Sequence, residues 1–275
     1  MPRRQRALLS PGVRMSSGSA MVAISFWIGM VTGCQDATSE EPTPVPLPVV
    51  VDDAGVTACT TAEGWTVELD RARVAVADLE FTIAGETHAA WWPRLADLLV
   101  RPAHAHPGHY AGGEVTGELA GSFLLELTPP AGAALGDASL LPGEYQGLNL
   151  RHRRADAGDG LDATDPLVGH TAVLAGRATR EGRTVRFAAS LDVPAGTQTV
   201  GGPFTLEVTA KTRRTLGLTL YTVDPSEQNT LFDGLDFAAL DADGDGEVTI
   251  QPGEAAHNVL MKTLIRHDHW GIVVR

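Results

Sequence analysis

The feature that most constrains the fold is a period-two alternation of apolar and polar residues, which recurs along the middle of this 275-residue chain. Such alternation places one face of a strand on a core and the other face in water. Glu181-Gly182 separates two alternating runs and predicts a hairpin turn. The runs are 65–69, 72–83, 114–119, 123–127, 145–150, 171–178, 184–193, 204–210 and 216–222. Because glycine and proline punctuate the runs and no helical crossover separates them, the pattern predicts a mainly β fold, an antiparallel β-sandwich spanning residues 63–223.

The apolar period becomes helical after residue 223. Asp224-Pro225-Ser226 predicts the start of a helix that runs to Leu240. Pro252 predicts the start of a second helix, because proline is favoured in a first helical turn. Residues 224–275 are therefore expected to form a small helix-loop-helix appendage and a C-terminal tail.

The N-terminus carries an export pattern. Four arginines precede the apolar run 21–31, which is too short to span a bilayer and ends in small residues, as secretory signals do. Val31-Thr32-Gly33-Cys34 closes this run and resembles the lipobox of bacterial lipoproteins. The resemblance implies a signal peptide at 1–33, cleavage before Cys34, a lipid anchor on its sulfur, and a location on the outer membrane or the periplasmic face. The alternative is that the run forms a buried apolar hairpin or helix.

Residues 34–62 are expected to form a stalk. Alternate prolines from Pro42 to Pro48 favour the extended polyproline II conformation. Cys59 is the one cysteine besides Cys34, so lipidation of Cys34 would leave it without an intrachain partner. We expect Cys59 to be a small buried residue, with pairing to another protein as the alternative.

The net charge limits the partners. It is −13 for the whole chain and falls to −17 for the 242 residues that remain after 1–33, a segment with four arginines and no acid. An acidic surface repels nucleic acid and attracts cations. We therefore expect metal ions as ligands and no nucleic-acid partner.

The loop between the two expected helices has the spacing of a calcium site. Asp241, Asp243 and Asp245 occupy alternate positions, and Gly246 permits a tight turn that brings their oxygens together. The loop resembles the calcium loop of EF-hand and dockerin proteins, although Pro252 stands where those families place a bidentate carboxylate. Glu254, two residues later, is the candidate replacement, and the alternative is a plain acidic turn. The predicted calcium ligands are Asp241, Asp243, Asp245, Glu247, Thr249 and Glu254.

Histidines suggest a second kind of metal site. In an extended segment, His104-Ala105-His106 directs both rings to one face, where imidazoles favour copper or zinc. The alternative is an exposed loop without metal. The candidate ligands are His104, His106 and His109, with His88 or His170 as a further ligand. His267 and His269 would either complete this site or form a second one.

The function predicted from these features is metal binding outside the cytoplasm. The chain bears a loose likeness to copper-associated surface proteins of methane-oxidising bacteria, which combine a secreted β-rich body with histidines near tryptophan; this favours copper over zinc. Motifs of hydrolases and of nucleotide-binding enzymes are absent, so no catalytic residue is assigned and binding is favoured over catalysis. The predicted role is metal uptake, sequestration or sensing. The alternatives are a calcium-stabilised adhesion module for a protein or glycan, and then a metal-dependent hydrolase.

Overall fold

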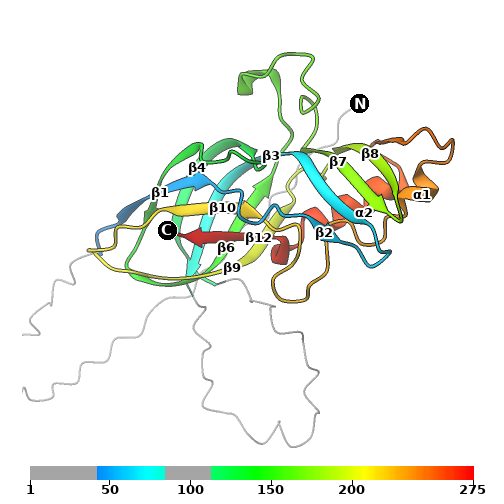
Figure 1. The fold of residues 1–275 in the computed structure, drawn as a ribbon. Coiled ribbons are helices and arrows are strands. Elements are labelled where there is room, and N and C mark those ends of the chain that lie inside the picture. The colour runs from blue at the N-terminus through cyan, green and yellow to red at the C-terminus, as the bar shows by residue number, and fades with distance from the viewer. Residues whose placement is uncertain (1–41, 84–112) are drawn as a thin grey trace, which may run out of the picture. The chain divides into compact units, whose positions relative to one another are not determined.

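The computed structural model describes residues 42–83 and 113–275, which belong to one compact unit. This unit is mainly β, with a 12-stranded sheet and two helices (Figure 1). In the part of the chain that the structure describes, no helix has the length and apolar character needed to cross a bilayer.

Strands make up about half of the described residues, and both α-helices lie in the C-terminal part of the unit. In chain order, the strands are β1 (Val45–Val51), β2 (Cys59–Thr60), β3 (Thr66–Ile83), β4 (Val115–Glu126), β5 (Ala134–Leu140), β6 (Gly143–His152), β7 (Ala172–Arg180), β8 (Arg183–Leu191), β9 (Gln198–Val208), β10 (Leu216–Leu220), β11 (Glu247–Ile250) and β12 (Trp270–Val274). The helices are α1 (Phe237–Leu240) and α2 (Ala255–Leu264), and the 3-10 turns are η1 (Ala157–Asp159) and η2 (His267–His269).

The 18-residue strand β3 organises the sheet. It pairs with β4 along one edge, while on the other edge β7 pairs with residues 66–74 and β6 with residues 76–83. The sheet continues from β7 to β8 and β11, from β6 to β9, and from β4 through β5, β1 and β10 to β12. The predicted mainly β, sandwich-like fold is confirmed, although the sheet is mixed because β1 runs parallel to β10 and β11 parallel to β8.

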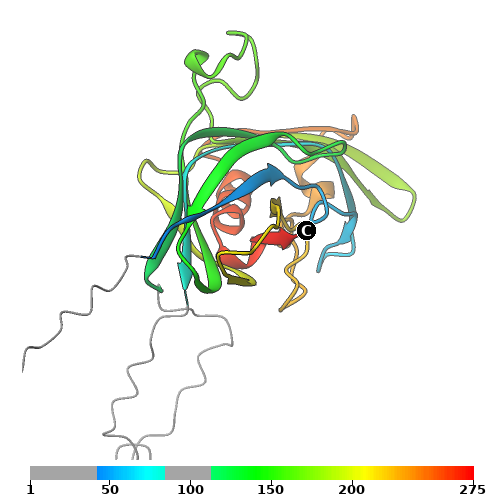
Figure 2. The same ribbon diagram turned by 90° about the vertical axis from the view of Figure 1, so that its left-hand side faces the viewer.

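The sheet curves so that its apolar face encloses a core in which α2 lies (Figure 2). The predicted hairpin joins β7 to β8, and both turn residues, Glu181 and Gly182, have positive φ (51° and 81°), as a two-residue type I′ turn requires. The largest fully buried side chains include Trp65, Phe81, Tyr145, Phe232, Phe237 and Trp270.

The predicted stalk is wrong from residue 45 onward. Val45–Val51 forms strand β1, which pairs with β5 along its length and with β10 from Val49 onward. Pro46 and Pro48 are exposed and precede the pairing with β10, so their missing N–H groups cost no ladder bond on that side. The alternate valines and leucine are buried, which makes this proline-rich segment part of the core.

The first predicted helix is also wrong, apart from its last turn. Residues 224–236 form turns, and only Phe237–Leu240 is helical. Asp224 accepts a hydrogen bond from the Ser226 N–H (2.7 Å) within a turn closed by the Val223–Thr230 bridge. Leu231 and Leu235 lie in or next to these turns, and their side chains are buried. The apolar residues that suggested a helix therefore pack into the core without forming one.

The second predicted helix exists as α2, although it begins at Ala255 rather than at Pro252. Ala256, Leu260 and Leu264 are buried in it. The segment after it is no appendage. Strand β12 pairs with β10, and the Trp270 indole N–H donates to the Leu264 carbonyl (2.7 Å). Residues 224–275 therefore belong to the same compact unit as the rest of the sheet.

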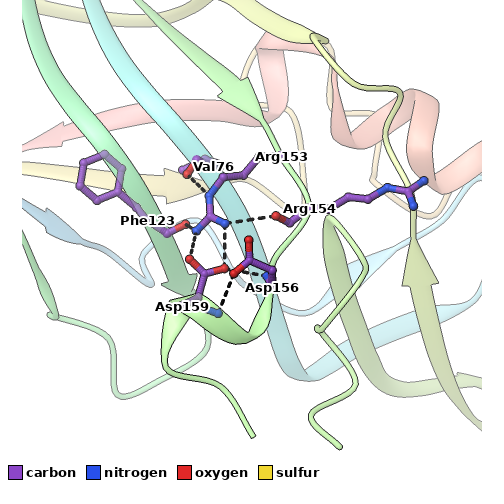
Figure 3. A network of polar contacts seen from close by, with 7 residues as sticks. Val76, Phe123, Arg153, Arg154, Asp156 and Asp159 are labelled. Carbon is purple, nitrogen blue, oxygen red and sulfur yellow. Dashed lines mark hydrogen bonds and ion pairs between the residues drawn. The ribbon is translucent and has the colours of Figure 1, made fainter. Parts of the chain in front are cut away.

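A loop near residues 155–165 is held to the sheet by two arginines. Arg73 pairs with Asp165 (2.8 Å), and the Arg153 guanidinium forms two 2.8 Å bonds to Asp159 (Figure 3). Arg153 also donates to the carbonyl oxygens of Val76, Phe123 and Arg154, so all five of its N–H donors are used. The pKa of Asp159 is lowered chiefly by its hydrogen bonds from Arg153.

We expect Arg153→Ala to lower the free energy of unfolding by about 3 kcal/mol. The substitution leaves the carboxylate of Asp159, whose side chain is 13 % exposed, and three carbonyl oxygens without their hydrogen-bond donor. Urea denaturation measures this loss. Arg154→Ala is the matched control: its side chain is 59 % exposed and pairs with Asp192, so a loss of under about 1 kcal/mol is expected. Equal losses in the two variants would show that the Arg153 network does not stabilise the loop.

Candidate metal centre in the acidic loop

The acidic loop, residues 241–250, follows α1, ends in β11 and brings three carboxylates together. One oxygen from each of Asp241, Asp243 and Asp245 lies within 4.8 Å of the other two. Ligands about 2.4 Å from one ion can be at most about 4.8 Å apart, so this spacing fits a single calcium ion. The side-chain oxygens of three of the six predicted ligands therefore lie close together.

Local hydrogen bonds give the loop this shape. The Gly246 N–H donates to Asp241 Oδ1 (3.1 Å), and the Glu247 N–H donates to Asp245 Oδ1 (2.8 Å). Gly246 has a φ of 82°, a left-handed conformation that glycine adopts without strain. The predicted role of Gly246 in the turn is thus confirmed.

The loop is fixed to the sheet at its C-terminal end. Strand β11 pairs in parallel with β8, and the Arg186 N–H donates to the Gly246 carbonyl (2.8 Å). Val248 is buried, and Ile250 is fully buried. The carboxylates are therefore held by the core and not by the loop alone.

Arg183 contributes a contact that the sequence did not suggest. Its guanidinium donates to Asp241 Oδ2 (2.7 Å), and the side chain of Asp241 is 1 % exposed. Hydrogen bonding to Arg183 is the largest of the effects that lower the pKa of Asp241. The carboxylate thus stays ionised, and each of its oxygens keeps a second acceptor position for a cation.

The remaining predicted calcium ligands lie beside this group. Glu247 and Thr249 are exposed on β11, and Glu254 is the residue preceding α2. Asp243, Glu247, Thr249 and Glu254 line one open pocket of about 470 Å³. Glu254 Oε2 accepts a hydrogen bond from the Gln251 N–H (3.0 Å), so in this conformation it braces the turn before the helix.

The predicted histidine site lies only partly within the described residues. His88, His104, His106 and His109 fall outside them. His170 Nδ1 contacts Asp192 (2.7 Å), and His269 is fully buried with Nδ1 against the Tyr221 carbonyl (2.8 Å). His267 lies in η2 beside it. Within residues 42–83 and 113–275, neither group of three metal-ligand side chains contains a histidine.

A second carboxylate group was not predicted. Asp224, Glu227 and Asp268 each offer an oxygen within 4.8 Å of the other two. Asp268 is 44 positions from Asp224, and the expected helix made Asp224 a cap. Since only the tertiary fold joins the two segments, no sequence spacing signals this group.

The chain's one described cysteine, Cys59, is buried and unpaired, as predicted. Burial is the main reason that its pKa rises to about 12, so the thiol stays protonated and unreactive at neutral pH. Cys34 lies outside the described residues.

Comparisons with family models, with curated proteins and with solved structures found no match to this chain.

The buried histidine His152 predicts an acid-sensitive fold. Burial lowers its pKa from 6.5 to about 4, so protons bind the unfolded chain more tightly than the folded one. Stability should therefore fall as the pH drops from about 6.5 to 4, by about 3 kcal/mol from this residue. In His152→Gln, which keeps an acceptor or donor near Thr199, urea denaturation across this pH range should show a flatter profile. An unchanged profile would contradict the assignment.

Proposed function

We propose that this chain is a lipid-anchored, extracytoplasmic metal-binding protein whose acidic loop binds calcium. The observation that carries the calcium proposal is the convergence of Asp241, Asp243 and Asp245 oxygens within 4.8 Å. Hard oxygen ligands of this kind suit Ca²⁺. The lipid anchor is supported by the sequence of residues 1–34 alone.

The surroundings of the loop favour a stabilising role for the ion. The site lies where β11 joins β8, and Arg183 already neutralises one of the three carboxylates. A bound calcium ion would neutralise the repulsion that remains between Asp243 and Asp245. Affinity in the range of extracellular modules, with a Kd of about 0.1–1 mM, would suffice outside the cytoplasm.

Calcium should raise the melting temperature of the full chain. At about 10 mM Ca²⁺, a site of that affinity adds ~1–3 kcal/mol, because only the folded loop binds. Asp243→Asn with Asp245→Asn should reduce the calcium-induced increase, as thermal unfolding with calcium and with chelator can measure.

Glu247→Gln is the matched control for this experiment. Glu247 is predicted to ligate through its backbone carbonyl, so changing its exposed side chain should leave the calcium-induced increase nearly intact. An equal increase in the wild type and in the doubly substituted loop would contradict calcium binding there.

The histidine-rich segment adds copper or zinc to the proposal, for uptake, sequestration or sensing. His104, His106 and His109 would supply imidazoles, with His88, His170, His267 or His269 as further ligands. The described histidines of this set contribute little to such a site. His269 is fully buried, and His170 Nδ1 contacts Asp192.

We expect the full chain to bind copper or zinc, and His104→Ala with His106→Ala to lower the bound metal by at least tenfold at micromolar free metal. Elemental analysis after dialysis gives the stoichiometry. His257→Gln tests a histidine outside the cluster and should leave the metal content unchanged. Wild-type metal content in the double variant would leave the calcium-stabilised interaction module as the better interpretation.

A further inference from the structure

The second carboxylate group lies at the contact between two segments that are distant in the sequence. Asp224 and Glu227 belong to the turns after β10, and Asp268 belongs to η2, which precedes β12. The Tyr221 N–H donates to the His269 carbonyl (2.8 Å) and holds the two segments together. The group is thus placed where the C-terminal strand enters the sheet.

Two carboxylate oxygens in this group lack a hydrogen-bond partner. Asp224 is fully buried; its Oδ1 accepts from the Ser226 N–H (2.7 Å), while its Oδ2 is buried without a hydrogen bond. Asp268 is 9 % exposed, and its Oδ1 is likewise without a partner. Buried acceptors without partners are costly, and an ion or ordered water is the usual reason that they persist.

The nearby basic groups leave two of these oxygens without a partner. Arg266 contacts Asp268 and lies 3.4 Å from Glu227, so its guanidinium reaches two of the three carboxylates. The ring of His269 is fully buried. Its Nδ1 lies against the Tyr221 carbonyl (2.8 Å) and its Nε2 has no hydrogen-bond partner, so neither nitrogen contacts these carboxylates. His267 also lies in η2, and its own contacts leave the two unpartnered oxygens of Asp224 and Asp268 unsatisfied.

We propose that Asp224, Glu227 and Asp268 form a second cation site, specific for a divalent ion that prefers oxygen ligands, such as calcium. Their oxygens lie within 4.8 Å of one another, which fits one ion at about 2.4 Å from each ligand. Glu227 is exposed and offers a route for the ion and its remaining waters. The bound ion clamps the turn after β10 to η2 and thereby fixes the start of β12.

Equilibrium dialysis of the full chain against calcium tests the site. Asp243→Asn with Asp245→Asn removes the acidic loop as a ligand set, and this variant should still bind one calcium ion per chain. Adding Asp224→Asn and Asp268→Asn should abolish that binding, with at least a tenfold loss of affinity. Asparagine keeps an oxygen for the Ser226 N–H, and the exposed residue Asp137, changed to asparagine, is the control. Unchanged stoichiometry after Asp224→Asn and Asp268→Asn would overturn the proposal.

The two sites fail separately. If the acidic loop did not bind calcium, the wild-type chain would bind one ion, and Asp224→Asn would remove it. If the second site did not bind calcium, the wild-type chain would bind one ion that only the loop substitutions remove. Arg266→Gln provides a variant with both aspartates intact. It removes the competing guanidinium, so calcium should bind at least as tightly and should restore the melting temperature. Loss of stability that calcium does not restore would show that Arg266 alone neutralises the group.

Discussion

The structure depends on one bulged strand. β3 carries β4 on one edge and divides its other edge between β7 and β6, with a register shift between Ala77 and Leu79. Asp78 takes a φ of 46° at this point and accepts a hydrogen bond from the Gly121 N–H (3.2 Å). An extra residue bends a strand and increases its twist. The bend therefore lets one sheet curve over its own core. β7 pairs with the part of β3 that precedes the bulge, and β8 carries β11 and the acidic loop.

The acidic loop and the second carboxylate group are attached to different parts of this sheet. The loop is joined to β8 through β11, whereas Asp224 and Asp268 flank the pairing of β10 with β12. At both sites, a segment near the C-terminus pairs with a strand that precedes it in the sequence. Carboxylates that repel one another without a cation, and attract once one is bound, would couple these joints to the calcium concentration.

The sequence predicted what depends on local pattern. Period-two alternation located most strands, the Glu181-Gly182 turn was found, and the spacing of Asp241, Asp243 and Asp245 anticipated their convergence. Prediction from the sequence failed where contacts between distant segments determine the structure. The prolines of β1 suggested a stalk because proline has no backbone N–H to donate. Only the arrangement of the neighbouring strands shows that no ladder hydrogen bond is required at these positions. The apolar period near Leu231 suggested a helix, although separate turns bury the same side chains. Arg183 and the second carboxylate group have no local signal, since their partners are far away in sequence.

The most direct test of the central claim is long-wavelength anomalous diffraction from crystals of the protein grown with calcium. Bound calcium predicts an anomalous peak between the carboxylates of Asp241, Asp243 and Asp245, within about 2.3–2.6 Å of their oxygens. A loop with no such peak, and with Asp241 paired to Arg183 alone, would contradict the proposal that the acidic loop binds calcium.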